Sequence, residues 1–142
     1  MKRIITITFA IIIFATAFTA CAQQSNAQRL IANIPFAFTA HNKTLPAGKY
    51  TITVLNSSSD RKALQIRSMN RRFSAVVLTN TLIGRVSDNA KLVFERYNDR
   101  YFFAQAQLAG DSTTLAALQS NKDHKHAVAT AKKKSVVVII AG

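Results

Sequence analysis

The 142-residue sequence contains a single cysteine, no tryptophan and only six acidic residues. If Cys21 is removed with an N-terminal leader, the remaining chain has no thiol, and no disulfide can stabilise it. A domain of this size must then be held together by a buried apolar core. The scarcity of acids also weighs against glycoside chemistry, which needs two positioned carboxyl groups. Glu95 and Asp99 flank a predicted hairpin. Their neighbours Arg96 and Arg100 make ion pairing the better interpretation of both acids.

The N-terminus has the three parts of a secretory signal peptide. Lys2 and Arg3 are followed by an uncharged apolar run at 4–17 and then by small residues that include cleavage motifs. The run is shorter than the roughly 20 residues that a membrane-spanning helix needs. We therefore predict an exported protein with a signal peptide at 1–22 and a single domain at 23–142.

Three processing sites compete in this leader. The tripeptide Ala-Cys-Ala at 20–22 fits signal-peptidase cleavage, and Ser-Asn-Ala at 25–27 fits cleavage as late as residue 27. The segment 18–21 resembles the lipobox of bacterial lipoproteins, although Phe18 stands where a lipobox usually has an aliphatic residue. Cys21 is therefore a candidate lipidation site that would tether the domain to a membrane. The alternative is that Cys21 is a small residue of a discarded peptide.

The charge is strongly one-sided. Lysine and arginine total 19, and the net charge is +13. Lys2 and Arg3 belong to the leader, so 17 basic and 6 acidic residues remain for the predicted domain, a net charge of +11. Such a field concentrates polyanions, which outside the cytoplasm are acidic polysaccharide, lipid head groups and released nucleic acid. A solubilising coat without a dedicated partner is the alternative.

No recognisable nucleic-acid motif accompanies this charge, so we expect no specific nucleic-acid partner. The basic residues expected to lie in loops facing an anionic partner are Arg61, Lys62, Arg71, Arg72, Lys132, Lys133 and Lys134.

Apolar residues recur mostly with a period of two, which predicts a mainly β protein. The strand at 73–79 is apolar on both faces, which places it centrally or in a curved, closed sheet. The run at 136–140 is predicted to be a final buried strand. Asn98 and Asp99 suit a tight hairpin turn. The predicted strands lie near 34–38, 50–54, 64–66, 73–79, 91–97, 100–108 and 136–140.

One short helix is predicted near 121–132, before the last strand. The Ser-x-x-Asp pattern at 120–123 is typical of a helix start. Lysines 132–134 would lie in the last turn, where they suit the negative end of the helix dipole. About seven strands and one helix predict a single antiparallel sandwich or small barrel-like domain.

Four segments of the predicted domain are distinctive: IPFAF at 34–38, LPAGKYTI at 45–52, KLVFERYNDRYF at 91–102 and GDST at 110–113. Together they resemble a group of small exported β-rich bacterial proteins for which no catalytic residue is established. Asn98 replaces a residue that is usually glycine in that group, and Ala37 one that is often acidic. The resemblance implies a β-rich exported domain and supplies no active site. The segment at 45–52 alone is also similar to the start of prealbumin-like modules, where it forms a structural turn.

Two short motifs resemble catalytic motifs of known enzymes. Gly-Asp-Ser at 110–112 resembles the nucleophile motif of the GDSL hydrolases, and the segment 123–126 contains their Asp-x-x-His. That family needs a long α/β domain between the two motifs, whereas about ten residues separate them here. His124 and His126 are two apart on a predicted helix and point in different directions, so they cannot share a metal ion well. We therefore predict no catalytic residue, no metal and no cofactor.

These observations favour a non-enzymatic domain of the cell envelope, either free or lipid-anchored. Its expected ligands are anionic polysaccharide or lipid head groups. The alternative is an interaction module that presents a sheet edge to an envelope protein, and a small hydrolase ranks third. The oligomeric state stays open.

Overall fold

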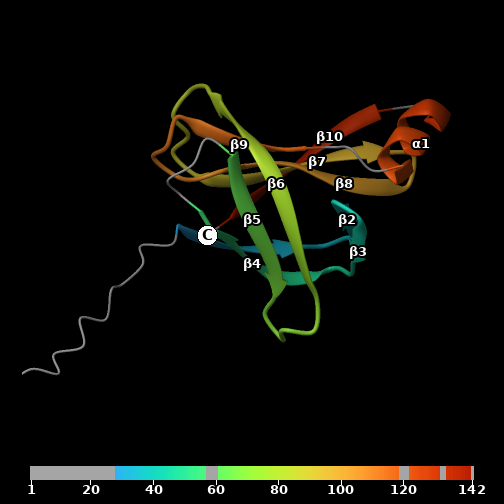
Figure 1. Ribbon diagram of the computed structural model, residues 1–142, viewed down its shortest axis with the longest axis horizontal. Helices are drawn as coiled ribbons and strands as arrows, with labels where there is room; N and C mark the ends of the chain where they lie inside the picture. Colours follow the sequence, from blue (N-terminus) through green and yellow to red (C-terminus); the bar gives the residue numbers. More distant parts are fainter. Residues whose placement is uncertain (1–27, 57–60, 119–121, 132–133, 142) are drawn as a thin grey trace, which may run out of the picture.

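A computed structural model describes residues 28–56, 61–118, 122–131 and 134–141 (Figure 1). The described chain is mainly β, with one short helix before the last strand, as predicted. The elements are β1 (Arg29–Ile34), β2 (Phe38–Ala40), β3 (Lys43–Leu45), β4 (Gly48–Val54), β5 (Arg61–Ser68), β6 (Ser74–Ile83), β7 (Ala90–Tyr97), β8 (Arg100–Gln107), β9 (Thr113–Ala117), α1 (Lys122–Thr130) and β10 (Lys134–Ala141).

Some predictions fall outside the described residues. They are the signal peptide at 1–22, its three processing sites with Cys21, the helix-start serine at 120, and Lys132 and Lys133.

The ten strands of the described residues all belong to one sheet. Its main path runs β1-β4-β5-β6-β9-β8-β7-β10, and every neighbouring pair on this path is antiparallel. The short hairpin of β2 and β3 joins it through a parallel pairing of Thr39 with Phe102. In Figure 1 the sheet bends so that β5 and β6 run steeply across the direction of β7 and β8. The bend brings β1 and β10, the two ends of the path, close together.

The bend encloses an aromatic core. Phe94 on β7 is fully buried, and its ring meets Phe36, Phe38 and Phe103 edge-on, with centroids 5.2, 5.2 and 5.8 Å away. The alternation of β4 is confirmed, because Tyr50 on that strand is buried and packs on Phe38. Burial raises the pKa of the Tyr50 hydroxyl, which donates a 2.7 Å hydrogen bond to the carbonyl of Pro46.

The chain forms more strands than the seven or so predicted. The expected strand at 34–38 is divided, because β1 ends at Ile34, before Pro35, and β2 begins at Phe38. Proline has no N–H to continue a ladder. β9 escaped prediction because its sequence, TTLAA, contains one large apolar residue, Leu115.

Two predictions about apolar strands have different outcomes. The central position predicted for 73–79 is confirmed, because β6 lies between β5 and β9, although Val76 and Leu78 on its outer face are 47% and 53% exposed. The prediction that 136–140 is a buried strand is wrong, since Val136, Val138 and Ile140 on β10 are 58%, 50% and 62% exposed. An apolar run shows a strand's propensity, and only the strand's neighbours decide whether its second face is covered.

The predicted hairpin and helix are confirmed and lie together. Asn98 turns β7 into β8 with a φ of 55°. Helix α1 lies on the outer face of this hairpin, where Ala127 joins a small cluster with Tyr97 and Phe102. The helix ends at Thr130, so Lys134 begins β10 and does not extend the helix as predicted.

Candidate anion-binding groove

A basic groove lies on the outer face of β1, β4 and β5. Its volume is about 390 Å³. Its arginines come from β1, from β5 and from the turn that follows β5. Most of the remaining lining residues carry hydroxyl or amide groups. The groove is lined by Arg29, Thr51, Thr53, Gln65, Arg67, Ser68, Met69 and Arg71.

Strand register explains how these residues meet. Arg29 lies across from Thr53, and Thr53 lies across from Gln65. Thr51 lies across from Arg67. Since side chains alternate along a strand, the buried residues between them face the core while this polar set faces outward. Antiparallel pairing therefore brings residues that are distant in the sequence into one patch. Arg29 and Thr51, for example, are 22 positions apart, and Arg29 donates a 3.4 Å hydrogen bond to the Thr51 hydroxyl.

The turn after β5 contributes the third arginine. Arg71 has a φ of 61°, and its N–H donates a 2.9 Å hydrogen bond to the carbonyl of Ser68. The Asn70 side chain fixes the turn through 2.6 and 3.0 Å hydrogen bonds to the Ser68 hydroxyl and the Arg72 N–H. The left-handed conformation costs a non-glycine residue about 1 kcal/mol. This backbone conformation places Arg71 in the lining of the groove together with Arg67.

The acids of the described chain lie elsewhere. Glu95 pairs with Lys134, and Asp99 pairs with Arg96. Within the described residues, no carboxylate pairs with Arg29, Arg67 or Arg71 and none lines the groove. Guanidinium groups match carboxylates and phosphates through paired, charge-assisted hydrogen bonds. The groove therefore has the chemistry to hold a hydroxylated anion.

The structure places the predicted basic residues in different environments. Arg71 lines the groove, and Arg72 is exposed in the same turn. Arg61 and Lys62 lie in β5, not in a loop as predicted, because the strand begins at Arg61. Arg61 is on the same face as Arg67 but at the other end of the strand, whereas Lys62 is on the core-facing side and partly buried.

Lys134 is engaged elsewhere. Its ammonium donates a 3.0 Å hydrogen bond to Glu95 Oε1, so it is not a groove residue. Sequence reasoning missed Arg29 and Arg67. For Arg67 the signal was its alternation with Leu64 and Ile66, which already put it on the outer face of β5.

Glu95 is the centre of a second polar cluster. Its Oε2 accepts a 2.8 Å hydrogen bond from the Tyr97 hydroxyl and lies 3.3 Å from His124 Nε2. Burial alone would raise the pKa of Glu95, but hydrogen bonds from Tyr97, Lys134 and His124 outweigh it and lower the pKa. The pKa of Tyr97 is raised by burial and by Glu95, and that of Lys134 by its hydrogen bond to Glu95. Ion pairing of Glu95 was expected, but its partner is Lys134 and not Arg96 or Arg100.

This cluster predicts an acid-dependent stability. A carboxyl with a lowered folded pKa contributes stability that is present above its unfolded pKa, near 4.5, and lost as pH falls through the folded value. We expect Glu95→Gln to lower the free energy of unfolding by about 1–2 kcal/mol at pH 7. The difference should shrink as the pH falls below about 4.5. Urea denaturation across pH measures it. Asp99→Asn is the control, because Asp99 is 99% exposed. A difference that does not change with pH would contradict this role of Glu95.

The hydrolase motifs are not brought together. The Ser112 turn adjoins the end of β8, where Gln107 Nε2 donates a 3.0 Å hydrogen bond to the Asp111 carbonyl. His124 stacks edge-on against Phe102, near the start of β8, at 5.2 Å between centroids. Five residues of extended strand separate Phe102 from Gln107, which is about 17 Å. Ser112 and His124 therefore lie too far apart to act as a catalytic pair.

No cluster of three or more His, Cys, Asp or Glu residues that suits a metal ion occurs in the described part of the chain. In the same residues, no helix has the length and apolar character to cross a membrane. Comparison with protein-family models, curated proteins and solved structures finds no match. The function is therefore inferred from the residues of the groove and from the signal-peptide pattern of the sequence.

Proposed function

We propose that the protein is an exported, non-enzymatic envelope domain that binds anionic material through the basic groove. The carrying observation is the convergence of Arg29, Arg67 and Arg71 on one hollow, with no described acid among its lining residues. The signal-peptide pattern and the resemblance to small exported proteins support the compartment. There, acidic polysaccharides and lipid head groups supply the anions.

The arrangement favours a site over a solubilising coat. A coat needs only scattered charge, whereas this groove combines three guanidinium groups with the hydroxyls of Thr51 and Thr53. From strand spacings of about 4.8 Å and a rise of about 3.4 Å per residue, the Cα atoms of Arg29 and Arg67 lie about 12 Å apart. A ligand would therefore meet two separate charges with hydroxyl partners between them. Such spacing suits an extended ligand better than a small free ion.

We infer a barrel-like closure of the sheet as the rigid base for this groove. β1 and β10 end the strand path and lie beside each other, so the sheet curls almost completely around its core. A curled sheet holds its outward residues at fixed spacing, which reduces the ordering cost of binding.

Salt dependence tests the proposal. Binding of the exported protein to polygalacturonate should weaken by roughly a hundredfold between about 50 and about 500 mM NaCl, because each of three arginine contacts releases counterions with a slope near 0.7. Calorimetric titration at several salt concentrations measures the slope. An affinity that does not change with salt concentration, or no binding at low salt, would contradict the proposal.

A second candidate is a protein-binding module. Val136, Val138 and Ile140 form an exposed apolar stripe along β10, which pairs with β7. Exposed stripes of this kind often mark interaction surfaces. Capture of an envelope protein that persists at high salt would favour this candidate over the groove.

A further inference from the structure

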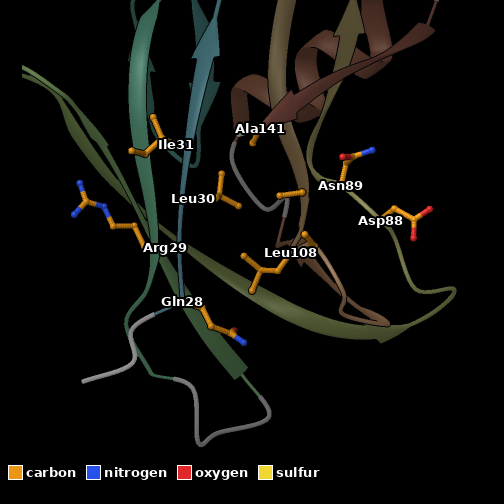
Figure 2. A pocket seen from close by; sticks show the side chains of 10 residues that line it. Gln28, Arg29, Leu30, Ile31, Asp88, Asn89, Leu108 and Ala141 are labelled. Atoms are coloured by element: carbon orange, nitrogen blue, oxygen red, sulfur yellow. The ribbon is translucent and has the colours of Figure 1, made fainter. Parts of the chain in front are cut away.

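A second hollow adjoins the basic groove at β1. Its volume is about 760 Å³, within the range of about 300–1,000 Å³ typical of ligand pockets. It opens beside the place where β1 and β10 come together. One part of its lining is aliphatic, and Gln28, Arg29, Asp88 and Asn89 make the rest polar. Figure 2 shows Leu30 on β1 and Leu108 projecting into the gap, with Ala141 above them.

This slot reaches the core. Leu30 and Ala141 are both 7% exposed and belong to the core cluster, while Leu108 and Ala90 pack against it. An aliphatic chain that enters between Leu30 and Leu108 would therefore contact the apolar core and be removed from water, which is favourable. The part of the lining that meets the core is aliphatic and has no aromatic platform for a sugar ring, so this part favours a flexible aliphatic chain.

The charged residues around the slot determine which end of such a ligand lies on which side. Arg29 lines both hollows, and its side chain lies on the flank of β1 away from the slot (Figure 2). Asp88 stands on the opposite rim, beside Asn89. An anionic head is repelled by Asp88 and attracted by Arg29, so it should lie on the groove side.

We propose that the two hollows together bind one anionic lipid, with its phosphate head in the basic groove at Arg29, which lines both hollows, and an aliphatic chain in the slot between Leu30 and Leu108. The inference rests on the proposed function and narrows its ligand from anionic envelope material to an amphiphile. Because β1 is an edge strand, a ligand can pass around it from the outer face into the slot.

Chain length is the decisive variable. We expect hexyl, octyl and decyl phosphate, titrated as monomers, to bind with affinity that rises about fourfold for each methylene that enters the slot. Arg29→Gln should weaken all three by a similar factor. Ala109→Trp narrows the slot at an exposed position and should abolish the dependence on chain length. Ala129→Trp, at an exposed site on α1, is the matched control and should change nothing.

The outcomes separate the two proposals. Polygalacturonate binding without any chain-length dependence would overturn the lipid inference and leave the groove proposal standing. A chain-length dependence that survives Ala109→Trp would place the aliphatic chain elsewhere and also overturn the inference. Absence of binding to both polygalacturonate and the alkyl phosphates would overturn both proposals. Circular dichroism confirms that each variant is folded before titration.

Discussion

Replacement of Phe94 by alanine is expected to lower the free energy of unfolding by about 3–5 kcal/mol. Phe94 is fully buried and meets three other phenylalanine rings, so the substitution removes apolar contact and leaves a cavity. A domain of this size has only about 5–15 kcal/mol of stability in total. The variant should therefore be largely unfolded at temperatures where the wild type is intact. Urea denaturation followed by circular dichroism measures the change.

Phe73→Ala is the matched control, because Phe73 is 40% exposed and precedes β6. Its cost should stay below about 1 kcal/mol. Equal losses for the two variants would contradict the position of Phe94 at the centre of the core.

Charge reversal in the groove should have the largest effect on binding. Arg29→Glu combined with Arg67→Glu replaces two attractive contacts with two repulsive ones. Polygalacturonate affinity should fall at least tenfold at low salt, and the slope of log affinity against log salt should lose roughly 0.7 for each contact removed. Both side chains face outward from the sheet, so the fold should persist. Calorimetry at several salt concentrations gives both quantities.

Lys122→Glu combined with Lys125→Glu changes the net charge by the same amount. Both lysines are exposed on α1, on the hairpin of β7 and β8 and away from the groove. We expect less than a twofold change in affinity for this control. Equal losses for the two double variants would show that net charge alone drives binding.

The sequence correctly predicted the features that depend on residues close together along the chain. The alternation around Ile52 gave the inward and outward faces of β4, and Leu64 and Ile66 marked the position of β5. Asn98 marked the hairpin because few residues tolerate a positive φ. The helix before the last strand followed from a polar start and a short apolar stripe, and only its extension into the lysines was wrong.

The missed features depend on contacts between distant segments. The exposure of Val76 and Leu78 reflects an outer face of β6 that the described fold leaves open, and no property of the strand itself reveals this. Lys134 was assigned to an anionic partner, but β10 pairs with β7 and places it against Glu95.

The groove itself was only partly accessible from the sequence. Arg71 was singled out as a turn residue, but the convergence of Arg29 and Arg67 needs the register of β1 on β4 and of β4 on β5. Charge counts predicted the sign of the ligand. The site could not be located without knowing which strands are neighbours.

The central claim is that the groove binds anions as a site. Amide chemical-shift mapping during titration with oligogalacturonate tests it most directly. The amides of Arg29, Thr51, Thr53, Gln65 and Arg67 should shift in a saturable way, and those of α1 should stay in place. Small shifts spread over all basic residues, including Lys122 and Lys125, would contradict the claim and identify the charge as a solubilising coat.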